Sequence, residues 1–351
     1  MRLALGGKTL FFKGILVLLW SGFPTGLMSA DLLLVSNHPE RLSEPASLLM
    51  YQVPSGKTLR LLYHHKNVTT IPLRFVITAK SVAGIGKMAT LLAVAGPVSD
   101  EVFVGHKAVE RYWEQLPQRK PDMPIDTRET PLLDVMLKPG EIVSGIFECK
   151  SDVETLFDVR VVDPVYEDAS YALMARQLTP MVYPTPTIVQ DVVYRVGDVI
   201  EEISIGGMPF VLNPALQNPL KGNYGVTYKI HAALENPDPV ARKVSLLFAP
   251  LGGVARAIVR LNGTQLLKTG NVGGTGFPTV VEMMHVILPP QSKKNVVLEV
   301  MPQSGSYYPI HLVLRSEGPS TMSGTLTSVV EESNSEAMPR MVLQEVVNNG
   351  Y

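Results

Sequence analysis

The side chains with the most reactive chemistry in this sequence are few and widely spaced. His64 and His65 are adjacent, and adjacent residues of a strand point to opposite faces, so the two imidazoles cannot share a metal ion. Cys149 is the only cysteine, and the next histidine after it is His231, so the close Cys–His spacing of a blue-copper site is missing. We therefore expect structural histidines, a buried and unreactive Cys149, no metal site and no cofactor.

Motifs for catalysis are equally scarce. The glycine-rich run from Gly270 to Gly276 is followed by Phe277-Pro278 and a strand pattern, whereas a phosphate-binding loop needs a helix N-terminus at that place. The sequence holds no Gly-x-Ser-x-Gly and no His-Glu-x-x-His. We therefore assign no catalytic residue and expect a protein that is not an enzyme. The alternative is a secreted hydrolase with converging carboxylates between two domains.

Two pairs of adjacent aromatic residues are the candidate binding residues, because aromatic side chains are enriched at binding sites. They are Tyr112 and Trp113 in the first half, and Tyr307 and Tyr308 in the second. Trp113 has two interpretations. It either fixes a helix to a sheet or offers part of an aromatic platform to a sugar ring or a protein.

The first thirty residues have the pattern of a signal peptide. Arg2, Lys8 and Lys13 precede the apolar run from Gly14 to Trp20, which is too short to span a membrane, and cleavage is expected near Ala30. The pattern predicts an extracytoplasmic protein, whether secreted, periplasmic or at the cell surface, with no integral membrane span after cleavage.

Composition limits the class of protein further. Hydrophobic residues make up 46% of the 351 residues and charged residues 18%, which is ample material for buried cores. Loss of residues 1–30 removes three basic groups and no acidic ones, so the net charge falls from −1 to −4. We therefore expect no nucleic-acid partner, since such partners require a basic surface.

Short runs that alternate polar and apolar residues dominate the rest of the chain and indicate strands with one buried face. Such runs occur in both halves, at 59–63, 73–78, 141–147, 226–230, 244–248, 255–261 and 296–300. They predict an all-β fold with two tandem immunoglobulin-like β-sandwich domains, although the Cys–Trp–Cys signature of true immunoglobulin domains is missing.

The two halves match in order, which suggests duplication of one module. In each half a strand runs into a turn that opens at an asparagine, Asn67 or Asn236, whose short amide can bond its own backbone. The strand-and-proline pattern at 133–140 matches that at 284–291, and the strand pattern at 157–162 matches that at 310–315. The alternative is that any two β domains would look this similar.

The first half carries an insertion. From Asn67 to Pro139 is 72 positions and from Asn236 to Pro290 is 54, a difference of 18 residues. The insertion falls near 105–131 and contains one amphipathic helix, predicted over 106–116, with apolar residues at 108, 109, 112, 113 and 116.

These patterns predict the following organisation: a signal peptide at 1–30, a first sandwich at 31–163, a linker at 164–189, a second sandwich at 190–317 and a polar, flexible tail at 318–351. A short helix is expected over 169–177. The segment 341–347 is expected to add a further strand or to act as a docking peptide. With no disulfide available, two separate hydrophobic interiors must hold the domains together.

Together these features favour an exported, non-catalytic binding or structural protein of the cell envelope, with an adhesion, assembly or scaffold role. Its expected partner is a protein or a glycan at the cell surface. A pair of carbohydrate-binding modules is the main alternative, and the hydrolase is the other.

Overall fold

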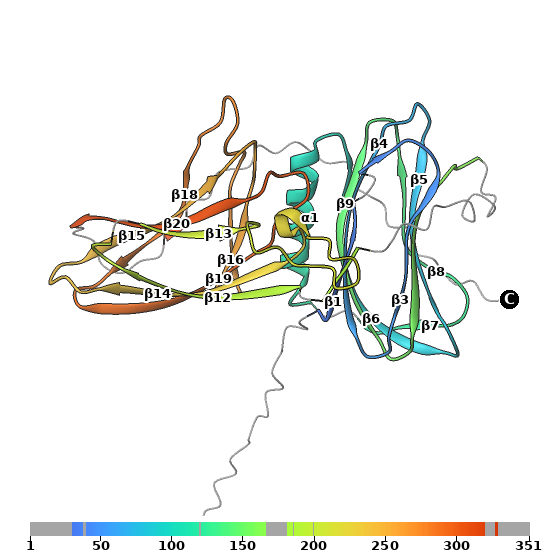
Figure 1. The fold of residues 1–351 in the computed structure, drawn as a ribbon, viewed down its shortest axis with the longest axis horizontal. Helices are drawn as coiled ribbons and strands as arrows, with labels where there is room; N and C mark the ends of the chain where they lie inside the picture. Colours follow the sequence, from blue (N-terminus) through green and yellow to red (C-terminus); the bar gives the residue numbers. More distant parts are fainter. Residues whose placement is uncertain are drawn as a thin grey trace, which may run out of the picture.

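The computed structural model describes residues 30–37, 40–118, 121–165, 181–184, 186–198, 200–319 and 327–328. Strands dominate these residues and form two pairs of facing sheets with a helix between them (Figure 1). The prediction of an all-β fold with two tandem immunoglobulin-like sandwiches and a helical insertion in the first is therefore confirmed. The predicted signal peptide up to residue 29, the helix at 169–177 and the segment at 341–347 lie outside the described residues.

The first sandwich consists of a larger and a smaller sheet. The larger sheet has the strand order β11-β1-β4-β9-β6-β7, with β2 beside β4, and the smaller has the order β3-β10-β5-β8. The strands are β1 Leu32–Ser36, β2 Arg41–Leu42, β3 Ala46–Val53, β4 Thr58–Asn67, β5 Leu73–Ser81, β6 Gly86–Val98, β7 Met123–Ile125, β8 Thr130–Leu137, β9 Ile142–Ser151, β10 Thr155–Val162 and β11 Met181–Tyr183.

The second sandwich has two sheets of five strands, in the orders β12-β14-β19-β16-β17 and β13-β20-β15-β18-β21. Its elements are β12 Thr187–Arg195, β13 Glu201–Ile205, the 3-10 turn η1 Lys221–Asn223, β14 Thr227–Asn236, β15 Arg242–Pro250, β16 Ile258–Leu261, β17 Gln265–Lys268, β18 Val281–Leu288, β19 Ser292–Val300, β20 Ile310–Pro319 and β21 Thr327–Ser328. The expected strand at 255–261 is shorter than predicted, because Ala255 makes only an isolated bridge to Val272.

The two sandwiches share one topology. The order β1-β4-β9-β6-β7 of the first corresponds to β12-β14-β19-β16-β17 of the second, and β3-β10-β5-β8 corresponds to β13-β20-β15-β18. In both, the first strand pairs in parallel with its neighbour, β1 with β4 and β12 with β14. This shared order agrees with duplication of one module.

The asparagine turns of the two halves are also equivalent. The Asn67 side-chain oxygen accepts from the backbone N–H of Thr69, and its amide donates to the carbonyls of Ile71 and Leu137. Asn236 accepts from Asp238 N–H and donates to the carbonyls of Val240, Leu288 and Pro289. The predicted turn chemistry is therefore confirmed in both halves.

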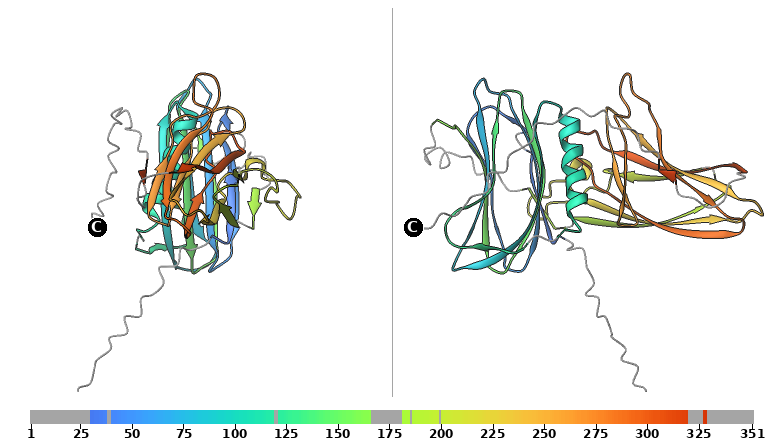
Figure 2. Two further views of the ribbon diagram at one scale, coloured as in Figure 1. Left: turned by 90° about the vertical axis from the view of Figure 1, so that its left-hand side faces the viewer. Right: turned by 180° about the vertical axis from the view of Figure 1, so that it is seen from behind.

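The helix α1 Glu101–Gln115 is the main difference between the modules. It is inserted between β6 and β7, whereas the equivalent strands β16 and β17 are joined by a tight turn through Asn262 and Gly263, both with positive φ. The helix begins five residues before the predicted start, because Asp100 caps it by accepting from Phe103 N–H. Figure 2 shows it standing between the sandwiches, alongside the larger sheet of the first.

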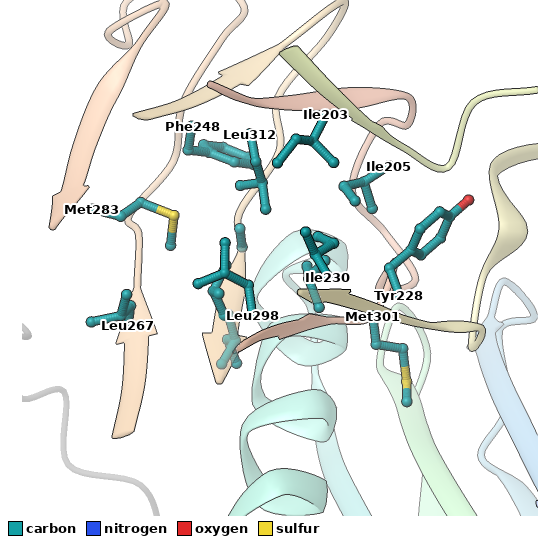
Figure 3. Packing of buried hydrophobic residues seen from close by; sticks show 14 of the residues in the cluster. Ile203, Ile205, Tyr228, Ile230, Phe248, Leu267, Met283, Leu298, Met301 and Leu312 are labelled. Carbon is teal, nitrogen blue, oxygen red and sulfur yellow. The ribbon is translucent and has the colours of Figure 1, made fainter. Parts of the chain in front are cut away.

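The two sandwiches have separate hydrophobic interiors, as the sequence predicts, but the interior of the second extends beyond its own sandwich. One cluster fills the first sandwich, around Tyr63, Phe75 and Phe157. The other fills the second sandwich, where Phe248 and Leu312 lie opposite Ile230 and Leu298 (Figure 3). It continues through Trp113 to Ile146 on the outer face of the first sandwich. The extension arises because α1 carries buried apolar side chains, Val109, Tyr112 and Trp113, at the junction.

Two predicted boundaries also differ from the structure. Part of the expected linker, Met181–Tyr183, forms β11 beside β1, and β12 begins at Thr187 instead of after residue 189. In the expected tail, β20 extends to Pro319 and β21 pairs with β18. Short segments without a clear strand pattern are recruited here by open sheet edges.

Candidate functional site

The junction between the sandwiches is organised by a buried arginine on β4. Arg60 donates from Nε to Glu148 Oε1 on β9 at 2.7 Å, and from Nη2 to the Tyr112 hydroxyl on α1 at 2.9 Å. The same hydroxyl donates to Glu148 Oε1 at 2.8 Å. Burial by itself would lower the pKa of Arg60, but Tyr112 and Glu148 together raise it above its usual value. The guanidinium is therefore a permanent, fully desolvated charge.

Arg60 also reaches the second half of the chain. Its Nη1 donates to Gly225 O at 2.8 Å, to Thr227 Oγ1 at 3.0 Å and to Pro186 O at 3.3 Å. One side chain thus connects the larger sheet of the first sandwich, the helix and the start of the second sandwich. Carbonyl and hydroxyl acceptors satisfy the donors that Glu148 leaves free, as burial of a charged group requires.

A second buried ion pair lies on the other side of the helix. Arg260 on β16 donates from Nε to Glu299 Oε2 on β19 at 2.8 Å, and both side chains are almost fully buried. The Arg260 guanidinium lies 4.5 Å from the centroid of the Trp113 ring, a cation–π contact. The Trp113 ring meets Tyr112 edge-on at 5.0 Å. The two aromatic residues therefore link one ion pair in each sandwich.

The helix also approaches the second sandwich at backbone distance. A Cβ at Gly105 would lie 1.8 Å from the carbonyl oxygen of Ser304. A Cβ at Gly305, which has φ 78°, would lie 2.1 Å from the carbonyl oxygen of Glu101. Only glycine fits at either position, so the first half of α1 packs directly on the loop at 304–305.

Polar side chains of the helix make further contacts near this loop. Glu110 pairs with Lys107 at 2.6 Å and with Lys268 on β17. His106 is buried, with Nδ1 3.4 Å from Nε2 of Gln303. Burial, together with the nearby Arg256, lowers the pKa of His106 to about 3, so the imidazole is neutral at physiological pH.

The first pair of candidate binding residues lies inside this junction. Tyr112 is 1% exposed and Trp113 is 3% exposed, so neither ring offers a face to solvent. Of the two interpretations of Trp113, the structure supports the one in which it fixes the helix to the sheets. The ring does so between both sandwiches, and not against one alone.

The second pair is divided between surface and interior. Tyr307 is 64% exposed, and its ring lies on Gly253, where a Cβ would be 2.4 Å from ring carbons. Tyr308 packs edge-on against Tyr224 with ring centroids 5.7 Å apart, and burial raises the pKa of its hydroxyl. Tyr307 is therefore the most exposed of the four candidate residues, and Tyr308 is half-buried.

The histidine pair and the cysteine have structural surroundings. His65 bonds Ser36 Oγ through Nε2 at 2.9 Å and packs on Phe75, whereas His64 points to the other face of the sheet, 3.7 Å from Glu40 Oε1. Cys149 is buried, as predicted, and burial raises the pKa of its thiol. Among the described residues, no group of three His, Cys, Asp or Glu side chains is placed to hold a metal ion.

One surface hollow lies away from the junction between the sandwiches. It has a volume of about 230 Å³ and lies on the first sandwich, lined by lysine and aspartate side chains together with small residues: Gly56, Lys87, Ala89, Asp122, Lys150, Ser151 and Asp152. Asp152 Oδ1 accepts from Lys87 N–H at 2.6 Å, so this carboxylate is already bound to the backbone. The place where the hydrolase alternative puts its site is filled by the Arg60 and Trp113 contacts described above.

The charged residues of the junction are the main feature that sequence reasoning missed. Each interrupts an apolar strand: Arg60 between two leucines, Glu148 between Phe147 and Cys149, and Glu299 between Leu298 and Val300. That interruption of a strand buried on both faces is the signal that would have found them.

In the described chain, no helix is long and apolar enough to span a membrane.

One long strand edge is open. β12 is the last strand of its sheet, and its only partner strand in the described part of the chain is β14. The equivalent strand β1 carries β11 on the corresponding side. An open edge exposes a row of backbone donors and acceptors to which another strand can pair.

Comparisons with known proteins do not assign a family. No protein-family model matches the sequence, and no curated protein matches it significantly. Among solved structures, Lac15 from a marine microbial metagenome is 12% identical over 86% of this chain, which spans 65% of the Lac15 chain, with a TM-score of 0.16. The CBM22-1–CBM22-2 tandem domain of Paenibacillus barcinonensis Xyn10C is 8% identical, with 82% of this chain and 99% of that chain covered, also with a TM-score of 0.16. At these TM-scores neither likeness bears on function.

Proposed function

We propose that this protein is an exported binding or structural component of the cell envelope, and that its two sandwiches act as one rigid body. The observation that carries the proposal is the junction, where Arg60 on β4 bonds both α1 and the start of the second sandwich. A rigid body of this kind holds sheet edges and loop ends at fixed positions, as an assembly or scaffold component requires.

The junction is unusual for two domains in tandem. Interdomain contacts within a chain are commonly polar and permit relative motion. Here an apolar cluster runs from the second sandwich through Trp113 to the first, and buried ion pairs flank it on both sides. Motion at the junction would expose these charges and the indole ring together, so the two sandwiches stay fixed.

Export is tested first, since the envelope role depends on it. The full chain with a C-terminal tag is expressed in a Gram-negative host, the cell is fractionated, and the N-terminus of the purified protein is determined by mass spectrometry. We expect the protein outside the cytoplasm with an N-terminus near Ala30. A cytoplasmic protein that retains residues 1–30 would contradict the proposal.

Binding is tested with the processed chain. The protein is sedimented with intact envelopes, with envelopes shaved by protease, and with isolated peptidoglycan. Loss of binding after shaving indicates a protein partner, and retention on peptidoglycan indicates a glycan. Failure to sediment with any of the three preparations would contradict an envelope-binding role.

Carbohydrate binding is a second candidate, favoured by the exposed Tyr307 ring lying flat on Gly253. Sugar rings stack on exposed aromatic faces of this kind. A glycan array probed with the wild type, Tyr307→Phe and Tyr307→Ala tests it. Binding retained in the phenylalanine variant and lost in the alanine variant supports a platform, whereas equal binding by all three excludes one.

A further inference from the structure

The open edge of β12 lacks several of the features by which proteins block strand pairing. Its nine residues include no proline and no lysine, and its register with β14 is continuous from Thr187 to Arg195. Blocking features are the usual protection of an exposed strand against pairing with another chain. A strand of this length without proline, lysine or a bulge is open to pairing, and its two exposed charges, Asp191 and Arg195, have opposite signs.

The exposed residues of β12 are complementary to themselves. Alternate side chains face solvent: Val189, Asp191, Val193 and Arg195. The two valines are 58% and 63% exposed, and Val193 stands between an acidic residue two positions before it and a basic residue two positions after it. Such a sequence pairs well with an antiparallel copy of itself.

We propose that β12 pairs with β12 of a second copy of this chain, antiparallel and about a two-fold axis at Val193. A two-fold interface brings the same surface of both subunits together. In this register Val193 lies opposite Val193 of the partner subunit, and Asp191 lies opposite Arg195 of the partner subunit, twice by symmetry. The valines and both ion pairs share one face of the combined sheet.

Charge selects this register over the one with the longest overlap. Centring the axis on Asp191 would pair all nine residues, but it would place the two Asp191 carboxylates directly opposite each other. Like charges at opposite positions destabilise an antiparallel pair, whereas opposite charges stabilise it. Asp191 already lies 3.2 Å from His231 Nδ1 on β14, which holds its carboxylate at the edge.

The direction of β12 gives the same result. The strand begins at the junction, since the carbonyl of Pro186 accepts from Arg60 and from Thr227 N–H. It runs along the second sandwich beside β14 (Figure 1). An axis near its far end therefore places the two first sandwiches at opposite ends of an elongated dimer, where they do not collide.

A cysteine cross-link tests the register, and the chain suits this experiment because its only cysteine, Cys149, is buried. In Val193→Cys the two introduced thiols face each other at a Cα separation of about 4.5–5.5 Å, which a disulfide spans. Under mild oxidation we expect a covalent dimer in non-reducing gels. In the matched variant Val189→Cys the thiols are about 27 Å apart along the strand, and we expect no cross-link.

Charge reversal tests the same contact in solution by sedimentation equilibrium. Asp191→Arg and Arg195→Asp alone each place like charges opposite each other twice, and we expect the dimer dissociation constant to rise about tenfold or more. The double variant restores opposite charges and should return to near the wild-type value.

Three results would each overturn the proposal. They are a wild-type chain that is monomeric at all concentrations, a dimer that is insensitive to both charge reversals, and a cross-link in Val189→Cys in place of Val193→Cys. A monomer whose introduced thiol at position 193 is protected from alkylation would assign the edge to another segment of the same chain, and would also overturn it. None of these results bears on export, so the envelope role is tested separately.

Discussion

The two sandwiches share a strand order but differ in the position of the buried cation. Glu148 on β9 and Glu299 on β19 occupy equivalent strands, and each pairs with an arginine. The arginine comes from β4 in the first sandwich and from β16 in the second. In both cases the guanidinium contacts an aromatic side chain of α1, the Tyr112 hydroxyl or the Trp113 ring. The location of the cation thus follows the helix that covers it, and not the repeated module.

The sheet edges differ in a related way. β1 is covered by β11, which belongs to the segment that leads from one sandwich to the other, whereas β12 has no such cover among the described residues. One module therefore uses its neighbouring chain to close the edge that the other leaves open. The comparison suggests that the modules have separate tasks, with the first forming the junction and the second presenting an edge.

The largest effect on stability is expected from removing the buried cation of the first sandwich. The control removes the residue at the equivalent position of the second sandwich. Arg60→Ala leaves Glu148 buried without its cation, which costs about 3–5 kcal/mol in the free energy of unfolding. Lys229 on β14 is the equivalent residue and is half-buried, while Glu299 retains Arg260, so Lys229→Ala should cost less than about 0.5 kcal/mol. Urea denaturation measures both. Equal losses would show that the charge pair has no special role at the junction.

A second comparison concerns close backbone contacts. Gly105→Ala places a methyl group against the Ser304 carbonyl and should cost about 2–3 kcal/mol, because the helix must move away from the second sandwich. Gly252→Ala is the control, since a Cβ there meets nothing within 4 Å and the residue has no positive φ. Small-angle scattering reports whether the helix variant also loosens the junction. An unchanged scattering profile and an unchanged stability would show that the helix and the loop at 304–305 accommodate the methyl group without cost.

Acid should act on the junction through His106. Its pKa of about 3 in the folded protein lies below the ordinary value near 6.5, so between these pH values the unfolded chain binds the additional proton. The stability that this residue contributes is therefore present above about pH 6.5 and falls as the pH is lowered, by about 3 kcal/mol at pH 4.5. The groups around it are Arg256, Glu110, Lys107 and Lys268.

The measurement compares thermal unfolding at pH 7.5 and pH 4.5 in His106→Asn, in the exposed control His231→Asn and in the wild type. We expect a smaller acid-induced loss in His106→Asn and a wild-type loss in the control. His64, whose pKa is lowered to about 4 mainly by burial, adds a loss of the same sign in all three proteins. An identical pH dependence in all three proteins would exclude His106 as a contributor.

What the sequence predicted correctly is local. The strands, the asparagine turns and the existence of the inserted helix follow from patterns within a few residues. The ion pair of Arg60 and Glu148 joins residues 88 positions apart, and no local pattern states which strands will be neighbours. The extension of the second core onto the first sandwich depends on which side of the second sandwich meets the helix, and β11 and β21 form only because an edge is available to them.

For the candidate site the same division holds. Trp113 was correctly considered as a residue that fixes the helix, because its position on an amphipathic stripe is local information. Its second contact, to Arg260, depends on how the two modules dock, which the sequence alone does not state. Tyr307 and Tyr308 look identical in sequence, and tertiary packing on Gly253 and Tyr224 separates them.

The smallest expected effect tests the equivalence of the modules most directly. Asn67→Ala and Asn236→Ala each leave an unpaired carbonyl at the end of an equivalent strand, Leu137 in β8 and Leu288 in β18. Loss of such a buried bond costs about 1–2 kcal/mol, and if the turns do the same task the two losses should agree within about 0.5 kcal/mol. Serine at either position restores the turn acceptor but not the amide donors, so it should recover only part of the loss. A large loss at one asparagine and none at the other would show that the modules keep a common strand order without a common turn.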